Sequence, residues 1–408
     1  MSAEVEINTI TLIAGLNSTG KSTVGKILYS IFNSFYNIEE TSIQTIKGLI
    51  TRYIEDRFFG YDSMRLKVDR CVTELLTRRN IAKKEDIKEI IMMYLGSSFF
   101  SDQVDDPYYN NIVDLLNIST DEIYRNLLEN KLHGEFEDQI QNLYSNNNSY
   151  ISLDIKDSNI YVEIENNKVS SLNNFINLKT ESIYIDDPFI LDTLNAKYIS
   201  YRRDHKSDLY KKLRRGLRDN DNMENILHDI VMNKKISKIY DKLNSICKGN
   251  ILLSQKEGVN FKIEDSKENL KLINISTGLK TFVIIKTLLL NGVLEKKGLI
   301  ILDEPEIHLH PEWQKLLAEI IVLIQKEFDM HILINSHSPY FINAIDVYAQ
   351  KYKIRKTCKF YLAKDIDDTH KQSEIKDVSN NLEEINHLLF IPLQDLENER
   401  SLLEEDDE

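Results

Sequence analysis

A short glycine-rich segment near the start of the chain carries the most specific chemical pattern in the sequence. Residues 15–22 read Gly-Leu-Asn-Ser-Thr-Gly-Lys-Ser and match G-x-x-x-x-G-K-[ST] without a mismatch. They follow the apolar run 10–14, which is typical of a buried strand, and they precede a segment with helical character that extends to about Phe35. A strand, a turn of small residues and a helix form the setting in which such a loop binds phosphate groups, whereas a chance glycine-rich turn does not require that setting.

Each residue type in this loop has a physical role in holding a nucleoside triphosphate. Glycines allow backbone angles at which successive N–H groups converge on phosphate oxygens, and the start of the following helix adds partial positive charge. Lys21 can reach the β- and γ-phosphates, and the Ser22 hydroxyl can ligate Mg²⁺. The sequence therefore predicts the following nucleotide-binding residues: Gly15, Asn17, Ser18, Thr19, Gly20, Lys21, Ser22 and Thr23.

A second segment ends in two adjacent carboxylates. Residues 298–302 are apolar apart from a leading glycine, and they lead directly into Asp303 and Glu304. Such a strand is buried on both faces of a parallel sheet, so its carboxyl end opens at the ligand crevice. Asp303 can hold Mg²⁺ directly or through water, and Glu304 can polarise the attacking water. Two adjacent buried carboxylates without a metal would be costly, which favours a catalytic metal site over a structural accident.

Two further segments add to the predicted site. The strand-like run 331–336 ends at His337, whose neutral imidazole can contact the γ-phosphate and the attacking water. A histidine after a strand is more often structural, but its place one strand–helix unit after the paired carboxylates predicts a catalytic switch. Ser276 and Gly278 open an apolar helix that extends through Leu290, and a helix start of this composition forms an anion-binding corner.

These segments together resemble the ABC-type ATPases of the SMC/RecF/OLD group, and most closely the OLD-like AAA-family ATPases of anti-phage defence systems. The likeness is carried by GLNSTGKST (15–23), NISTGLK (274–280), ILDEPEIHLHPEWQ (301–314) and INSHSPYFI (334–342). It covers roughly residues 1–35 and 265–345. The resemblance implies an α/β fold, the ABC-type P-loop NTPase head, with a mostly parallel sheet, an antiparallel β part and a helical insertion. It also implies ATP and Mg²⁺ as cofactors.

The resemblance further implies a mechanism that needs two subunits. ATP would close a head-to-tail dimer in which Ser276 and Gly278 of one subunit complete the site over ATP held by the other, with the loop 306–311 at the interface. We cannot assign the family's Q-loop glutamine. OLD nucleases also carry a Toprim domain, and the chain after His337 is too short to fold one. We therefore interpret residues 365–367 as a surface turn and expect no nuclease activity in this chain.

The pattern along the chain predicts a discontinuous ATPase core with additions. The core is expected over 1–36, 150–200 and 250–395. Residues 37–149 read as a helical insertion, for which a separate helical domain is the alternative, and residues 201–249 read as a helical subdomain. Residues 396–408 are expected to form an acidic tail.

Composition limits the function less than these motifs do. The net charge of −14 argues against a surface coated uniformly for nucleic acid, but basic residues cluster between Arg202 and Arg218. That cluster fits DNA, RNA or an acidic partner, although the aspartates interspersed in it favour a solvated helix face. Three separated cysteines, the lack of a long apolar run and the lack of a signal peptide predict a cytoplasmic protein that does not contact a membrane.

Three function classes follow, and we rank them by the residues that support each. The leading hypothesis is an ATP-gated sensor or regulatory scaffold that forms a homo-oligomer and controls a separate effector, a toxin or a nuclease, in anti-phage defence. The alternative is a DNA-repair or chromosome-maintenance ATPase of the RecF or SMC kind, which would grip DNA through the 202–218 cluster or the insertion. A transporter ATPase fits least well, because no membrane segment is present.

Overall fold

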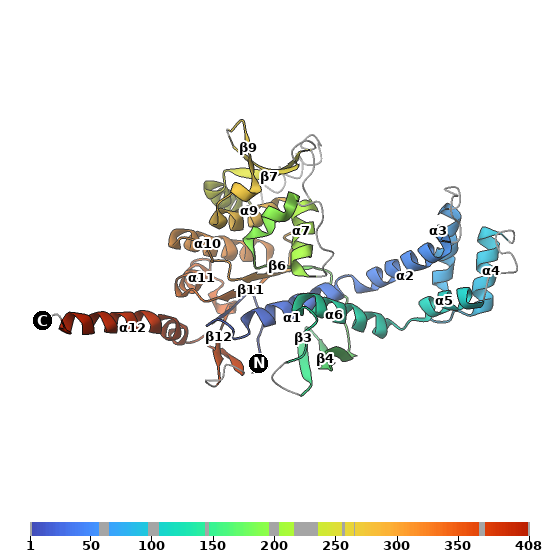
Figure 1. Ribbon diagram of the computed structural model, residues 1–408, viewed down its shortest axis with the longest axis horizontal. Helices are drawn as coiled ribbons and strands as arrows, with labels where there is room; N and C mark the ends of the chain where they lie inside the picture. Colours follow the sequence, from blue (N-terminus) through green and yellow to red (C-terminus); the bar gives the residue numbers. More distant parts are fainter. Residues whose placement is uncertain are drawn as a thin grey trace. The chain divides into compact units, whose positions relative to one another are not determined.

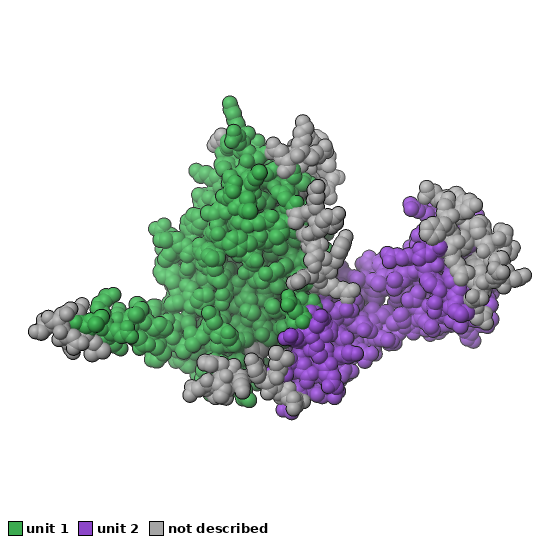
Figure 2. Space-filling view, in the orientation of Figure 1, with its two compact units in different colours: residues 1–33, 134–137, 180–408 green, residues 34–133, 138–179 purple. Residues whose placement is uncertain are grey.

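The computed structural model describes nine stretches of the chain, residues 2–56, 65–96, 106–142, 147–195, 204–215, 236–254, 258–264, 266–366 and 372–406. They form two compact units (Figure 2). Unit 1 contains residues 1–33, 134–137 and 180–408, and unit 2 contains residues 34–133 and 138–179. Residues 150–179, for which the sequence predicts a place in the ATPase core, thus fall in unit 2 together with most of the predicted insertion. The assignment of these segments to an ATPase core and an insertion stays a prediction.

A seven-stranded sheet forms the centre of unit 1 (Figure 1). Its strand order is β1-β13-β12-β2-β11-β10-β6, and every neighbouring pair is parallel except β12 with β13. The strands are β1 (Ser2–Ala3), β2 (Ile10–Gly15), β6 (Ser182–Ile185), β10 (Leu299–Asp303), β11 (His331–Ser336), β12 (Lys359–Asp365) and β13 (Ser373–Asp377). β2 and β10 are buried along their whole length, as expected for central parallel strands covered on both faces, and the edge strand β6 is buried along its whole length as well.

Helices connect and cover these strands. They are α1 (Lys21–Phe35), α7 (His205–Arg215), α9 (Thr277–Leu290), α10 (Pro311–Phe328), α11 (Pro339–Lys351) and α12 (Glu383–Asp406), with short 3₁₀ segments η3 (Pro188–Asn195), η4 (Leu272–Asn274) and η5 (Arg355–Thr357). α7 packs against β6, and α10 packs against α11. Both α10 and α11 begin with a proline, whose fixed φ angle and missing N–H suit the first helical position. α12 extends through much of the predicted acidic tail.

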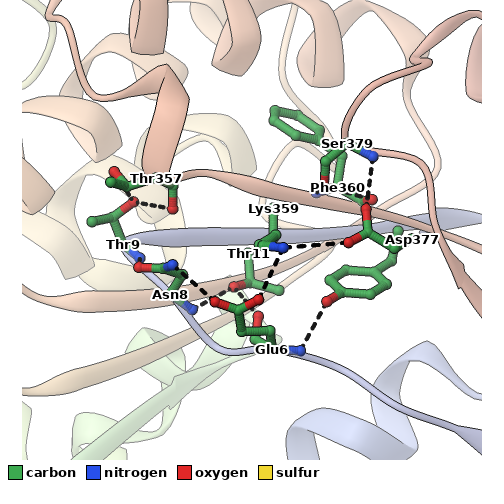
Figure 3. A network of polar contacts seen from close by, with 10 residues as sticks. Glu6, Asn8, Thr9, Thr11, Thr357, Lys359, Phe360, Asp377 and Ser379 are labelled. Carbon is green, nitrogen blue, oxygen red and sulfur yellow. Dashed lines mark hydrogen bonds and ion pairs between the residues drawn. The ribbon is translucent and has the colours of Figure 1, made fainter.

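A polar network fixes the segment before β2 to the strands beside it (Figure 3). The Lys359 Nζ lies 2.9 Å from Glu6 Oε2 and 3.4 Å from Asp377 Oδ2. The buried Thr11 hydroxyl donates to the Glu6 carbonyl at 3.0 Å and accepts from the Asn8 N–H at 2.9 Å. Because these residues lie at the amino end of β2, the network sets the register of that strand from the end opposite Gly15.

Unit 1 also contains a small antiparallel sheet, and unit 2 contains another. The first consists of β7 (Gly249–Ser254), β8 (Gly258–Ile263) and β9 (Asn269–Lys271), and it contacts α9 through β7. The second consists of β3 (Ser149–Ile155), β4 (Ser158–Glu165) and β5 (Lys168–Asn173). The predicted α/β class, with a mostly parallel sheet and antiparallel β parts, is confirmed.

The rest of unit 2 is helical. Its helices are α2 (Ile38–Glu55), α3 (Arg65–Thr77), α4 (Lys84–Leu95), α5 (Asp106–Asn117) and α6 (Thr120–Phe136), the last of which ends in residues of unit 1. Apolar side chains spaced three or four apart on α2 to α5 pack into one core, which is the amphipathic pattern that the sequence of this region shows. In the described residues, no helix is long and apolar enough to cross a membrane.

Candidate nucleotide-binding and hydrolysis site

The glycine-rich loop joins β2 to α1 through a backbone that only certain residues adopt. Gly15, Ser18 and Gly20 have φ angles of 153°, 64° and 89°. A Cβ atom at position 15 would lie 2.3 Å from the carbonyl oxygen of Ala363, so a glycine is required there. Thr19 is buried, and its hydroxyl donates to the Leu16 carbonyl at 2.8 Å, which closes the loop on itself.

Lys21 is buried at the start of α1 and turns back over the loop. Its Nζ donates to the carbonyl oxygens of Gly15 at 3.0 Å and of Leu16 at 2.7 Å. Burial lowers the pKa of Lys21, and the carboxylates of Glu304, Asp303 and Glu306 act in the opposite direction. The ammonium group of Lys21 thus rests on two neutral carbonyl oxygens, within the electrostatic influence of Glu304, Asp303 and Glu306.

Asp303 ends β10 and is held from both neighbouring strands. Its Oδ2 accepts a hydrogen bond from the Tyr184 hydroxyl of β6 at 2.6 Å, and its Oδ1 accepts one from Asn335 Nδ2 of β11 at 3.0 Å. All three side chains are buried. The parallel register pairs Asp303 with Asn335 directly, so the two side chains meet because their strands end together.

Glu304 and His337 come together one step beyond the strand ends. Glu304 has a φ angle of 50°, which is uncommon for a residue with a side chain, and its N–H donates to the Asn335 carbonyl at 2.9 Å. The His337 Nδ1 lies 3.2 Å from Glu304 Oε1. Both side chains are partly open to solvent, as groups that act on a water molecule must be.

Glu306 is a carboxyl group of the site whose role the sequence did not predict. Its side chain is 3% exposed, the Ser336 hydroxyl donates to Oε1, and its Oε2 has no hydrogen-bond partner in the described residues. Burial raises the pKa of Glu306 above its usual range. Ser336 also accepts a hydrogen bond from the Ser338 N–H at 3.1 Å, which links Glu306 to the start of α11.

The residues present fit a bound Mg²⁺ ion. The Asp303 carboxylate and the exposed Ser22 hydroxyl supply oxygen donors of the kind that Mg²⁺ prefers. The Asn335 Oδ1 beside Asp303 is buried and has no partner in the described residues, so it can accept a hydrogen bond from a metal-bound water. Mg²⁺ bound with a nucleotide needs only one or two protein oxygens, because phosphates and waters supply the rest.

The predicted signature residues lie at the start of α9. Ser276 is exposed at the N-cap position of α9, and its side chain makes no capping hydrogen bond. Gly278 is buried, and a Cβ atom there would lie 2.9 Å from the His308 carbonyl oxygen. In the described part of the chain, no recorded hydrogen bond or ion pair joins Ser276 or Gly278 to the loop 15–23.

The basic cluster is only partly within the described residues, because Arg202, Arg203 and Arg218 lie outside them. Three described members pair with carboxylates. Lys206 lies 3.5 Å from Asp186 and from Asp187, Lys212 lies 2.6 Å from Glu181, and Lys211 lies 3.8 Å from Asp208. Lys206 and Lys211 therefore belong to a charge-balanced part of α7 that is open to solvent, whereas Lys212 is buried. Of the turn predicted at 365–367, Asp365 ends β12 and Asp367 lies outside the described residues.

Sequence reasoning missed Tyr184, Asn335, Glu306, His205 and Glu135. Asn335 was detectable as the single amide in the apolar run before Ser336. Tyr184 and Glu306 have types that occur throughout the chain, so their roles depend on strand register. The pairing of His205 with Glu135 joins residues 70 positions apart, which no local pattern reveals.

A phosphate-binding loop between a parallel strand and a helix, with a lysine and two carboxylates at the carboxyl edge of the same sheet, defines a P-loop nucleotide hydrolase. The comparisons agree. The chain belongs to the AAA ATPase domain family, whose model matches residues 1–342. The predicted P-loop NTPase class and the predicted binding of ATP are thereby confirmed.

Individual relatives are more distant. The chain is 26% identical over 206 residues to the "Retron Ec83 probable ATPase" of Escherichia coli, a match that covers 45% of this chain and 35% of that protein. An SMC head bound to the C-winged helix domain of ScpA aligns over 92% of both chains with a TM-score of 0.40 and 9% identity. A bacterial ABC transporter cassette solved as a dimer aligns over 53% of this chain and 92% of that chain with a TM-score of 0.20 and 14% identity.

Proposed function

We propose that this ATPase is Mg²⁺-dependent, closes head-to-tail as a dimer around ATP, and uses this cycle to regulate a separate effector protein. The observation that carries the proposal is the convergence of Lys21, Asp303, Glu304 and His337 at the carboxyl edge of β2, β10 and β11. In this proposal the backbone N–H groups of the loop and Lys21 bind the phosphates of ATP, with Lys21 leaving the Gly15 and Leu16 carbonyls.

Hydrolysis then depends on two partly open side chains. Bound Mg²⁺ supplies neutralisation of the charge that develops on the phosphate oxygens, and Ser22 and Asp303 would hold it. Glu304 accepts a proton from the attacking water while its carboxylate stays oriented by His337. In this proposal His337 also contacts the γ-phosphate, so the loss of that phosphate after hydrolysis changes a contact of the histidine.

The start of α9 supports the closure of a dimer, because Ser276 makes no capping hydrogen bond there. Ser276 is exposed, and its hydroxyl caps no N–H of its own helix, so the start of α9 presents an anion-binding corner to solvent. A second subunit whose α9 met the γ-phosphate would make the closed state depend on ATP rather than ADP, because ADP lacks that group. The resemblance to OLD-like ATPases supports a role in anti-phage defence beside a separate effector.

Phosphate release by the purified protein tests the catalytic part of this proposal. We expect Glu304→Gln to lower turnover about 100-fold or more while ATP still binds, because general bases contribute factors of this size. The matched control is Glu327→Gln, which alters an exposed glutamate of α10. In size-exclusion chromatography, Glu304→Gln with ATP should elute as a dimer or a larger assembly. Normal ATP turnover by Glu304→Gln would overturn the proposed role of Glu304 in hydrolysis. A Glu304→Gln protein that stays monomeric with ATP would overturn the proposed dimer.

The alternative is a DNA-repair or chromosome-maintenance ATPase. Arg214 and Arg215 are exposed on α7, and they are the described members of the basic cluster best placed to contact a phosphate backbone. DNA binding that weakens with salt and is lost in the Arg214→Glu, Arg215→Glu double variant would favour this alternative. Turnover that is indifferent to DNA would favour the effector-regulating scaffold.

A further inference from the structure

We propose that His205 is a positioning residue that connects the last turn of α6 to the Asp303 carboxylate by way of the Tyr184 ring. This inference rests on the proposed role of Asp303 at the metal. It concerns residues that no motif of the site contains, and all of them belong to unit 1. Three consecutive contacts carry it.

The first contact fixes one oxygen of Asp303. The Tyr184 hydroxyl donates to Asp303 Oδ2 at 2.6 Å inside the protein, where both side chains are buried. A buried hydrogen bond to a charged acceptor is stronger than one between neutral groups, so the Tyr184 hydroxyl fixes which lone pairs of Asp303 remain for a metal or its waters. Side chains that orient a metal ligand in this way commonly change metal affinity by 10- to 100-fold when removed.

The second contact fixes the Tyr184 ring. The His205 ring of α7 packs on it, with centroids 4.4 Å apart and planes tilted by 37°. Tyr29 of α1 meets the same ring edge-on, with centroids 6.0 Å apart. Because β6 sets only the backbone of Tyr184, contacts of its ring such as these two help to hold its hydroxyl in place.

The third contact fixes His205 from two sides. Its Nδ1 lies 2.6 Å from Glu135 Oε2, its Nε2 lies 3.0 Å from Asp186 Oδ2, and its own backbone N–H donates to Glu135 Oε1 at 2.6 Å. The histidine is 5% exposed and the glutamate side chain 0%. Burial lowers the pKa of His205, but the pairing with these carboxylates outweighs it and raises the pKa to about 9, so the ring is a cation at neutral pH.

Glu135 lies in the last turn of α6, a helix that begins at Thr120 in unit 2 and ends in unit 1. Its carbonyl oxygen also accepts a hydrogen bond from Lys26 Nζ of α1 at 3.2 Å, which fixes this turn beside the phosphate-loop helix. A rotation of the last turn of α6 would therefore move Glu135, then His205, then the Tyr184 hydroxyl. The geometry gives the last turn of α6 a route by which its position changes metal binding.

The test measures binding of a fluorescent ATP analogue across a range of Mg²⁺ concentrations and again in EDTA. The variants are Tyr184→Phe, which removes only the hydroxyl, His205→Gln and Glu135→Gln. We expect each to raise the Mg²⁺ concentration for half-maximal binding about 10-fold and to leave binding in EDTA unchanged. His387→Gln, an exposed histidine of α12, is the matched control and should behave as wild type.

Two results would overturn the inference. One is an unchanged Mg²⁺ requirement in Tyr184→Phe, which removes no buried charge. The other concerns the double variant Glu135→Gln, Tyr184→Phe. If the residues act in series, its Mg²⁺ concentration for half-maximal binding should rise about as much as in the more affected single variant. If the two fold-changes multiply instead, the residues act independently and the inference is wrong. If instead wild type needs no Mg²⁺ and Asp303→Asn changes nothing, the proposed function fails, and this outcome is distinguishable from the other two.

Discussion

Asp303 keeps both carboxylate oxygens bonded to neutral donors, Tyr184 on one side and Asn335 on the other. Neither donor neutralises the charge, so the carboxylate remains available to a cation while its orientation is fixed. Lys21 shows the complementary arrangement, because its ammonium group rests on two neutral carbonyls and lies near three carboxylates. Asp303 and Lys21 therefore influence each other electrostatically. Among the described residues, however, the two side chains form no direct ion pair, because Lys21 bonds to carbonyl oxygens instead.

The phosphate loop makes a residue-scale prediction at Gly15. In Gly15→Ala the new methyl group would meet the Ala363 carbonyl, and the φ angle of 153° would be strained, so we expect a loss of about 3 kcal/mol or more of unfolding free energy. Thermal unfolding and soluble yield measure it. Gly48→Ala is the control with the opposite sign, because nothing lies within 4 Å of its Cβ position in α2 and alanine stabilises a helix by about 0.5–1 kcal/mol. Equal stability of the two variants would contradict the prediction.

His205 makes a prediction about pH. Its pKa is raised to about 9 in the folded protein from 6.5, so the stability it contributes is fully present below about pH 6.5 and is lost as the pH rises through 9. We expect unfolding in urea to become easier by at most about 3 kcal/mol across this range. The single tryptophan, Trp313 in α10, reports on unit 1. His205→Gln should show a flatter pH dependence, and an equal slope in both proteins would refute the assignment.

At the scale of elements, the connection between α9 and the small sheet of unit 1 depends on one buried cation. Lys286 is 1% exposed, and its Nζ donates to Asn244 Oδ1 at 2.7 Å and to the carbonyls of Cys247 at 2.9 Å and Gly249 at 2.8 Å. These three acceptors use all three protons of the ammonium group. Burial lowers the pKa of Lys286, but the full set of hydrogen bonds keeps this charged residue acceptable in the buried part of α9.

Replacing that cation should therefore be costly. In Lys286→Met the three hydrogen bonds of the ammonium group would be lost, and Asn244 Oδ1 and the two buried carbonyls would each miss one donor. We therefore expect a loss of about 2–4 kcal/mol in unfolding free energy. Urea unfolding followed by Trp313 fluorescence measures it. Lys315→Met on α10 removes an exposed lysine and should change stability by less than about 0.5 kcal/mol. A stable Lys286→Met protein would show that the small sheet packs on α9 without these bonds.

The strands that carry the site were the part of the fold that the sequence predicted best. The apolar runs at 10–14, 298–302 and 331–335 became β2, β10 and β11, neighbours in one parallel sheet, because continuous apolar strands must be covered on both faces. Contacts between segments far apart in the sequence could not be predicted, because the composition of those segments does not distinguish them from the rest of the chain. β6 became the edge strand beside β10, and only that register brings Tyr184 to Asp303. The series from Glu135 to His205 depends likewise on how α6 returns to unit 1.

At the scale of the whole molecule, the head-to-tail dimer predicts complementation between two inactive variants. Lys21→Ala damages the phosphate loop and Ser276→Arg the corner at α9, so each protein alone should hydrolyse little ATP. In a mixed dimer, the intact loop of one subunit meets the intact corner of the other. Equal mixing should therefore restore about a quarter of wild-type turnover, because half of the dimers are mixed and each has one complete site.

Phosphate release against mixing ratio measures this complementation, and its maximum should fall at equal amounts. Lys21→Ala mixed with Glu304→Gln is the control that separates the two geometries. Both changes damage the same half of the site, so no mixed dimer contains a complete one. Recovery in that control, or no recovery with Ser276→Arg, would exclude the head-to-tail arrangement.

One hydrogen-bonded pair in unit 1 bears on how this protein can change over generations. The Asn33 side chain donates to the Ser182 carbonyl at 3.3 Å and accepts from the Ser182 N–H at 3.0 Å, so the chain leaves unit 1 and returns to it at adjacent points. A segment joined at such neighbouring ends can be lengthened, trimmed or recombined between lineages without disturbing the sheet. We expect inherited variation to accumulate between residues 37 and 133, while a glutamate at position 135 is retained.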